Sequence, residues 1–371
     1  MICISLVSVV VALFTQGSAA PTAATVPGLS DGLNFKFPKT TKPVPWKISV
    51  DRAFIEITKL KAKLYRPNRE VMGLSDWEDG IPTATIKSVA KYWANEYDWF
   101  AIEKQINTNF SNFATVVQGG AEYPHPVPLH FVHHQSKRAD ATPLLLLHGW
   151  PSSFLLFADM IKGLVDPPKK SDPAFHVIIP SVPGFGFSPA AEYPGYGIEA
   201  MAKTFDALML QLEYPKYAIY TTDLGSFVGT AMLGSPTISS HLTAHVTDFY
   251  LVFATPEDLA RYAANQTTAE ETTYISAINA YGSQNAGYAG IHSTRPLSIA
   301  IAMTDSPVGY AGWIAQLEHA FGDGHVYSEE ELITNTMMLW IQGSYGNMRT
   351  YKTFPPVSIW ISDTMKKTLL T

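Results

Sequence analysis

The stretch YAIYTTDLGSFVG, residues 217–229, decides the fold and contains the first candidate for chemistry. Its apolar start, Tyr217–Tyr220, predicts a strand, and Phe227–Leu233 predicts the helix that follows. Small residues on either side of Asp223 fit a tight strand-to-helix turn that presents one reactive side chain. A carboxylate there can attack an electrophilic sp3 carbon and form an alkyl ester. Taken alone, however, the run is better explained by an aspartate that caps a surface helix.

Composition limits the class of protein. The chain has 371 residues, of which 46% are hydrophobic and 16% charged, so it can bury a sizeable core. This length fits one large α/β domain with an accessory segment, or two domains. A net charge of -6 and the lack of any Lys/Arg cluster argue against a nucleic-acid partner. The single cysteine is Cys3, so the rest of the chain offers no disulfide and no cysteine metal site. No metal or organic cofactor is indicated.

The N-terminus predicts a signal peptide over residues 1–19. An apolar run, Ile2–Phe14, is followed by small residues, and cleavage after Ala19 fits best. The run is shorter than the roughly 20 apolar residues that cross a bilayer. We therefore expect a secreted or endomembrane-lumenal protein, and any membrane association only through this segment. Because the run has no preceding Lys or Arg, a signal anchor stays open. The sequons that begin at Asn109 and Asn265 are compatible with this route.

Alternating strand and helix patterns predict an α/β fold. After a Pro- and Thr-rich arm over residues 20–42, apolar side chains recur at helical spacing in residues 51–64 and 86–106. The expected strands then lie at Leu129–Val132, Pro143–Leu147, His176–Pro180 and Tyr217–Tyr220, separated by helices at Phe154–Leu164 and Ile198–Leu212. Fully apolar strands of this kind predict a doubly wound, mostly parallel sheet that helices cover on both faces.

A helical insertion follows the strands. Residues 256–350 read as helices with breaks near Gly282, Pro296, Pro307 and Gly322–Gly324, and Val357–Ile361 as a strand that returns to the sheet. Such an insertion is expected to form a cap over the strand ends. We divide the chain accordingly into an N-terminal domain (43–135), a core (136–255), a helical cap (256–350) and a partial return to the core (351–371).

A second loop, His148-Gly149-Trp150-Pro151, follows the predicted strand that ends at Leu147. A sharp turn after a core strand can direct backbone N–H groups into a site. The amides of Trp150 and Leu224 would together form a two-donor oxyanion hole. We interpret His148 as a packing histidine that fixes the turn, and not as a catalytic base.

These motifs together resemble the epoxide hydrolases of the α/β-hydrolase fold. The resemblance rests on His148–Pro151, Pro183–Ser188 and Thr222–Ser226, which occur in the family's order and spacing. The upstream block from Tyr92 to Asn107 and the segment Gly287-Tyr288-Ala289-Gly290-Ile291-His292 are similar to the microsomal-type branch, which has its own N-terminal domain. The similarity runs from about Trp46 to Ile361.

The resemblance implies roles for particular residues. Asp223 matches the nucleophile that opens the epoxide, and Tyr288 and Tyr351 match the two cap tyrosines that protonate the leaving oxygen. The implied substrate is a small lipophilic epoxide, in detoxification or secondary metabolism, and the product is a vicinal diol. No cofactor is implied, and neither the substrate's identity nor the oligomeric state can be read from the sequence.

The sequence also departs from the family. The family's second half-reaction uses a histidine beyond the returning strand and an acid just after that strand. The last histidine here is His325, and Asp363 is a weak match for the acid. Two strands and a closing helix are also expected to be missing, which would expose a sheet edge. Thr221 replaces a usual Gly, and Leu224 a usual Trp.

Three hypotheses stay open. The first is an epoxide hydrolase whose sequence is truncated, and the second is a catalytically impaired member of the family that acts as a binder. The third is another enzyme with an aspartate nucleophile, such as a haloalkane dehalogenase.

Overall fold

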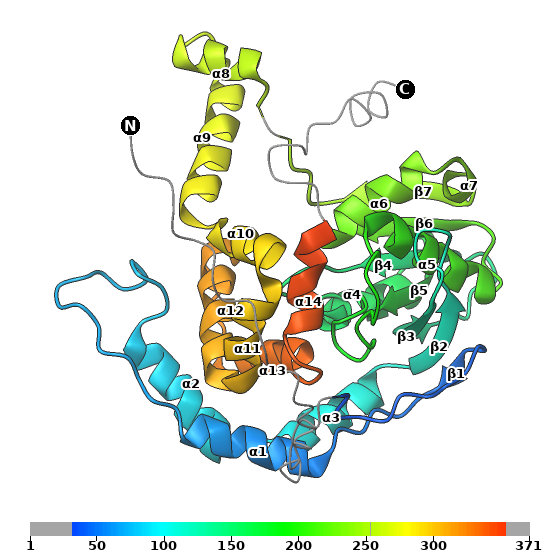
Figure 1. The fold of residues 1–371 in the computed structure, drawn as a ribbon. Coiled ribbons are helices and arrows are strands. Elements are labelled where there is room, and N and C mark those ends of the chain that lie inside the picture. Colours follow the sequence, from blue (N-terminus) through cyan, green and yellow to red (C-terminus); the bar gives the residue numbers. More distant parts are fainter. Residues whose placement is uncertain (1–31, 253, 354–371) are drawn as a thin grey trace, which may run out of the picture.

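The computed structural model describes residues 32–252 and 254–353. The described part alternates strands and helices and then becomes wholly helical (Figure 1). In chain order the elements are β1 (Val44–Pro45), α1 (Arg52–Lys63), α2 (Thr83–Asn95), α3 (Trp99–Asn109), β2 (Asn112–Gln118), β3 (Pro126–His134), β4 (Thr142–Leu147), the 3-10 helix η1 (Phe154–Phe157), α4 (Ala158–Val165), β5 (Phe175–Pro180), α5 (Ile198–Gln211), β6 (Tyr217–Thr221), α6 (Leu224–Gly234), α7 (Pro236–Ser239), β7 (Leu242–Thr247), α8 (Pro256–Ala263), α9 (Ala269–Gln284), α10 (Gly287–Thr294), α11 (Pro296–Asp305), α12 (Pro307–Phe321), α13 (Glu329–Trp340), α14 (Tyr345–Arg349) and the 3-10 helix η2 (Thr350–Thr353).

One mixed sheet forms the centre of the core, in the order β1-β2-β3-β5-β4-β6-β7. Strands β5, β4, β6 and β7 run parallel, whereas β1, β2 and β3 join them in antiparallel fashion. The buried halves of β4 and β5 explain why the apolar runs in the sequence read as parallel strands: each ends in four consecutive buried residues. The predicted α/β class with a mostly parallel core is confirmed.

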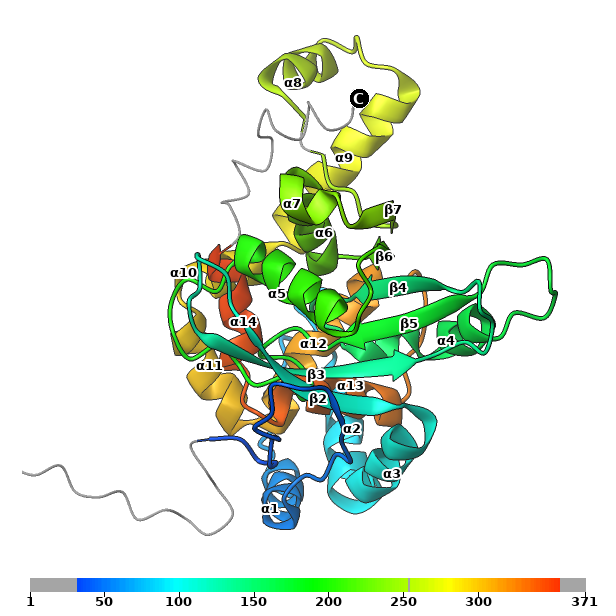
Figure 2. The same cartoon turned by 90° about the vertical axis from the view of Figure 1, so that its right-hand side faces the viewer.

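Helices cover both faces of this sheet. In Figures 1 and 2, α4 lies on one side of the strands and α5 on the other. Helix α5 buries nine of its residues, which include Met201, Phe205 and Leu208. At the far edge, the described part of the chain provides no further strand beside β7, whose side chains are half-buried or exposed. Among the described strands, β7 therefore forms the outer edge of the sheet on this side.

The sequence predicted one helix over residues 86–106, and this prediction was wrong. Two helices, α2 and α3, occupy the region and are separated at Glu96–Asp98. The Asp98 side chain accepts hydrogen bonds from the amides of Phe100 and Ala101, so it caps α3 and starts a new helix axis. The sequence pattern did not show the break, because buried aromatic residues continue through it: Trp93 lies before it, Tyr97 within it and Trp99 after it.

The segment predicted as a cap, residues 256–350, contains helices α8 to α14. Pro296 and Pro307 begin α11 and α12, and Gly322–Gly324 separate α12 from α13, as predicted. The break predicted near Gly282 comes slightly later in the chain, since Gly282 lies inside α9, which ends at Gln284, and a Cβ built on it would have no atom within 4 Å. The chain turns instead at Asn285 and Ala286. The predicted strand Val357–Ile361 lies outside the described residues.

The N-terminal helices support the cap. Helices α1 and α2 pack against α12 and α13, and the ring of Phe54 on α1 stacks on Trp340 with their centroids 5.2 Å apart. Ahead of them, the Asn34 side chain donates a hydrogen bond to the Ile341 carbonyl over 2.6 Å. The N-terminal region is thus bound to both the core sheet and the cap.

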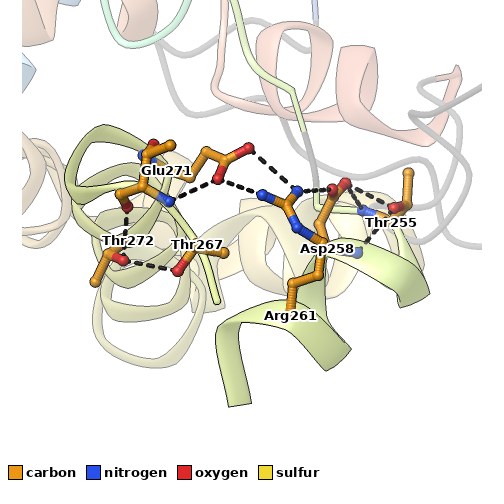
Figure 3. Close-up of polar contacts among 7 residues, drawn as sticks. Thr255, Asp258, Arg261, Thr267, Glu271 and Thr272 are labelled. Atoms are coloured by element: carbon orange, nitrogen blue, oxygen red, sulfur yellow. Dashed lines mark hydrogen bonds and ion pairs between the residues drawn. The ribbon is translucent and has the colours of Figure 1, made fainter. Parts of the chain in front are cut away.

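Helices α8 and α9 extend from the body of the molecule, with α10 at the base of α9 (Figures 1 and 2). Figure 3 shows how the two are joined: the Arg261 guanidinium on α8 bonds Asp258 and also reaches Glu271 on α9, at 2.6 Å. Thr255 and Thr268 cap the two helices in reciprocal boxes. No helix in the described ranges is both long and apolar enough to span a bilayer.

A close backbone contact brings α14 onto the core. Gly184, in the loop after β5, has φ +93°, and a Cβ built on it would lie 2.7 Å from the Gly346 carbonyl carbon. The Gln342 side chain, just before α14, donates hydrogen bonds to the carbonyls of Gly186 and Ser188 over 3.1 and 2.9 Å. These contacts fix the chain that carries Tyr351 against the carboxyl ends of the strands.

We predict that Gly184→Ala destabilises the protein by about 2 kcal/mol or more, because it combines an unfavourable φ with a collision against backbone. Gly163→Ala is the matched control. Gly163 is exposed within α4 and has no atom within 4 Å of a built Cβ, so alanine there should stabilise by roughly 0.5–1 kcal/mol. Urea unfolding of both variants measures this. Equal stability of the two variants would contradict the contact.

Candidate active site

The site forms where β4 and β6 end side by side. The two strands pair in parallel with Leu147 opposite Thr221, and the Thr222 amide donates to the Leu147 carbonyl over 3.1 Å. This register places the loop after β4 next to the turn after β6. Two motifs that are 73 residues apart in sequence therefore meet, and Trp150 and Asp223 touch.

Asp223 occupies the strand-to-helix turn in a strained conformation, with φ +46° and ψ -123°. Such a backbone costs on the order of 1–3 kcal/mol and is typical of functional positions. The Asp223 carboxylate does not cap α6. Its Oδ1 instead accepts the Trp150 amide over 2.8 Å. A Cβ on Gly149 would lie 2.1 Å from that oxygen, so only glycine leaves room for the carboxylate.

Burial controls the charge of this carboxyl. Loss of solvent raises the pKa of Asp223 from 3.8 to about 6, and hydrogen bonds from the amides of Trp150 and Leu224 oppose the rise. The two amides that the sequence predicted as an oxyanion hole therefore act on the Asp223 carboxyl itself. At neutral pH the carboxyl is ionised, poorly hydrated and oriented, which are the properties of a nucleophile.

Thr221 fits in the crowded turn because Gly229 leaves space for its methyl group and His245 bonds its hydroxyl. A Cβ on Gly229 of α6 would lie 2.9 Å from the Thr221 methyl, so Gly229 supplies the space. The Thr221 hydroxyl bonds His245 Nε2 on β7 over 2.8 Å. The replacement of a small residue in the turn is thus matched by a glycine on the facing helix.

The two predicted cap tyrosines meet above this turn. Tyr288 on α10 and Tyr351 on η2 have their hydroxyl oxygens 3.4 Å apart. The ring of Trp150 stacks on Tyr288, with centroids 5.0 Å apart and planes 18° from parallel, and meets Tyr351 edge-on at 5.8 Å. Burial and then the Asp223 charge raise the pKa of Tyr288 well above its ordinary value. For Tyr351, burial is followed by Tyr288 and Asp223 as causes of a similarly raised pKa. Both phenols therefore keep their protons near Asp223.

Trp150 also connects the turn to α14. Its indole N–H donates to Asn347 Oδ1 over 3.1 Å, and the Tyr310 hydroxyl donates to the same oxygen over 2.6 Å. The Asn347 amide in turn donates to the Leu339 carbonyl over 2.8 Å. This buried amide therefore fixes the ring of Trp150, and Tyr351 follows it by four residues.

His148 is engaged on both nitrogens. Its Nε2 accepts the Val182 amide over 3.2 Å, and its Nδ1 lies 3.2 Å from the Gly149 carbonyl. Burial lowers its pKa to about 4, so the ring is neutral. His148 thus connects the turn after β4 to the loop after β5, which agrees with the packing role expected for it. The neighbouring Pro151 completes the turn and is half-buried.

Three functional candidates were missed by the sequence reasoning. Asn347 lies four residues before Tyr351 but received no role. Tyr281 on α9 places its hydroxyl 3.4 Å from that of Tyr288. His292 is fully buried, its Nε2 accepts the Trp313 indole N–H, and its Nδ1 has no hydrogen-bond partner among the described residues. Only helical spacing could have signalled His292, which lies one turn after Tyr288, and nothing in the sequence marked Tyr281.

Two further predictions concern the acid of the second half-reaction and a metal site. Asp363 lies outside the described residues. Among residues 32–252 and 254–353, no group of three or more His, Cys, Asp or Glu side chains is arranged to hold a metal ion.

Comparisons with known proteins agree with this geometry. Residues 43–157 match the family described as epoxide hydrolase N terminus, and residues 142–285 match the alpha/beta hydrolase fold. A putative epoxide hydrolase of Stigmatella aurantiaca is 33% identical over 80% of this chain and 66% of its own length. Juvenile hormone epoxide hydrolase 1 of Ctenocephalides felis is 28% identical over 83% of this chain and 69% of its own. The chain thus spans about two thirds of the length of these relatives.

A solved structure extends the likeness to three dimensions. The epoxide hydrolase of Aspergillus niger superimposes with a TM-score of 0.72 over 86% of this chain and 81% of its own, at 25% sequence identity. Together with the two family matches, this shows that the chain belongs to the epoxide hydrolases of the α/β-hydrolase fold, in the microsomal-type branch with the epoxide hydrolase N-terminal domain.

Proposed function

We propose that this chain opens a lipophilic epoxide by forming an alkyl ester on Asp223. The observation that carries the proposal is the position of Trp150, whose amide holds the Asp223 carboxylate while its ring stacks on Tyr288. Trp150 thereby contacts both the proposed nucleophile, Asp223, and a proposed proton donor, Tyr288. Attack at carbon and protonation of oxygen must occur together in ring opening, because an alkoxide is a poor leaving group.

The chemical step balances within the site. An Asp223 oxygen forms a bond to an epoxide carbon, the C–O bond at that carbon breaks, and the epoxide oxygen takes a proton from a phenol. Tyr288 and Tyr351 are the proposed donors, since both keep their protons at neutral pH. The amides of Trp150 and Leu224 remain available to stabilise an oxyanion on the resulting ester.

Hydrolysis of that ester needs a base to activate water, and the described histidines near the site do not suit the task. Both nitrogens of His148 are engaged with backbone groups. His292 accepts the Trp313 N–H at Nε2, which leaves its proton on Nδ1, and burial lowers its pKa to about 3. We therefore propose that the 371-residue chain carries out ring opening efficiently and releases the diol slowly.

Halide chemistry is less well supported. A haloalkane dehalogenase would need N–H donors for the departing halide. The indole N–H of Trp150 already donates to Asn347 Oδ1 at 3.1 Å, and the groups that face Asp223 from the cap are phenols. Phenols suit a leaving group that needs a proton, which is an epoxide oxygen.

The aromatic surroundings of Asp223 support a substrate class. The rings of Trp150, Tyr288, Tyr351 and His292 pack on one another, edge-on or stacked, and Trp150 also bonds the Asp223 carboxylate. Such a surface favours an apolar epoxide over a charged one. The name of the relative from Ctenocephalides felis, juvenile hormone epoxide hydrolase 1, supports an epoxide as the substrate.

We predict a persistent adduct. Incubation with a lipophilic epoxide such as styrene oxide should add one substrate mass to the chain, because ring opening needs only Asp223 and a phenol. Asp223→Ala should show no adduct, whereas Asp140→Ala, which removes an exposed carboxyl paired with Arg138, should be labelled like the parent. Intact-mass spectrometry measures all three. Rapid steady turnover to diol without accumulated adduct would contradict slow release, and no adduct with no diol would leave the chain as an impaired binder.

We also predict the pH dependence of alkylation. With a pKa of about 6, Asp223 is protonated and unreactive at low pH and ionised above it. The rate should rise with pH, reach half its maximum near pH 6 and stay level through pH 9, since the phenols titrate well above 10. The measurement is the single-turnover rate of adduct formation against pH. A midpoint near pH 4 would show that the carboxyl is not desolvated.

A further inference from the structure

A third phenol, that of Tyr281, lies beside the two proposed proton donors. The hydroxyl oxygen of Tyr288 lies 3.4 Å from that of Tyr351 and also 3.4 Å from that of Tyr281. Tyr288 is thus the central member of a chain of three, with Tyr281 on α9, Tyr288 on α10 and Tyr351 on η2. The three hydroxyls come from separate elements that only the folded cap brings together.

The number of protons limits how the hydrogen bonds among the three phenols can be directed. Each phenol has a single proton, and the Tyr351 hydroxyl donates to the Tyr288 oxygen. If Tyr288 directs its own proton to an epoxide oxygen, its oxygen can only accept from its neighbours. Tyr281 must then be a donor to Tyr288. Proton transfer to the epoxide would leave a Tyr288 phenolate that receives one hydrogen bond from each side.

We propose that Tyr281 is a positioning residue for ring opening, whose hydroxyl donates to Tyr288 and stabilises the phenolate that forms as Tyr288 gives up its proton. The inference rests on the proposed function. Tyr281 keeps its own proton and touches neither substrate nor the forming C–O bond. Hydrogen bonds to a charged group are stronger than those between neutral groups, so its effect should grow in the transition state.

The surroundings of Tyr288 explain why its phenolate needs a second hydrogen-bond donor. Burial, the nearby Asp223 carboxylate and the contact with Tyr281 in the substrate-free site all raise the pKa of Tyr288, so they disfavour a negative charge on its oxygen. The proposal therefore requires the hydrogen bond between the two phenols to run from Tyr281 to Tyr288 once Tyr288 directs its proton to the epoxide. Tyr281 is half-buried, its ring contacts Phe321 at 5.8 Å, and burial raises its pKa, so it remains a donor at neutral pH. Its helix is joined to α8 through Arg261 and Glu271, the pair drawn in Figure 3.

The test measures the single-turnover alkylation rate at saturating epoxide for the parent chain, Tyr281→Phe and Tyr274→Phe. Tyr274 is the matched control, because it lies on α9 two turns earlier and its hydroxyl also forms a hydrogen bond, with the Val252 amide, away from the site. We expect Tyr281→Phe to lower the maximal rate about tenfold without changing the half-saturating epoxide concentration. Tyr274→Phe should stay within about twofold of the parent.

A double-mutant cycle separates positioning from general damage. If Tyr281 acts through Tyr288, Tyr281→Phe should add no further slowing in a chain that already carries Tyr288→Phe. Equal rates for Tyr281→Phe and Tyr274→Phe, or full additivity with Tyr288→Phe, would overturn this inference alone, provided that the parent chain is alkylated and Asp223→Ala is not. No alkylation of the parent would overturn the proposed function and this inference together.

Discussion

The structure depends on holding one carboxylate out of water on a strained turn. Asp223 has a positive φ and is half-buried, and loss of solvent raises the pKa of its carboxyl to about 6. Two backbone amides, from Trp150 and Leu224, partly offset the loss of hydration. The Trp150 amide would not be in place without the register of β4 against β6. The reactivity proposed for the site is therefore a property of the sheet as much as of the aspartate.

The cap is bound to this turn through Trp150, which makes three contacts. Trp150 supplies its amide to the nucleophile, its ring to Tyr288 and its indole N–H to Asn347. Because Asn347 lies on α14 and Tyr351 follows in η2, the phenol and the carboxyl are fixed relative to each other by buried hydrogen bonds. A change in the cap that leaves Asp223 untouched should therefore still affect the proton donors.

The sequence predicted the features that depend on local patterns. Apolar runs identified β4, β5 and β6, and the small residues around Asp223 identified the strand-to-helix turn. The break between α2 and α3 was missed because buried aromatic residues continue across it, and the break predicted near Gly282 was placed slightly early because an exposed helix tolerates glycine. Tyr281 could not be selected, since only the folded cap brings it to Tyr288. His292 lies one turn after Tyr288 on the same helix, so only helical spacing could have signalled it. Pairings between distant elements are decided by packing, which no single-sequence pattern records.

The most direct test of a desolvated carboxylate compares the stability of the parent chain with that of Asp223→Asn across pH. A carboxyl whose pKa rises from 3.8 to about 6 on folding contributes no penalty when protonated at low pH, and an increasing penalty as pH rises through that window. The asparagine variant should therefore be more stable by about 2–3 kcal/mol at pH 8, and the difference should vanish near pH 4. A variant that is less stable than the parent at pH 8 would show instead that the charged carboxylate stabilises the fold, as a helix cap would.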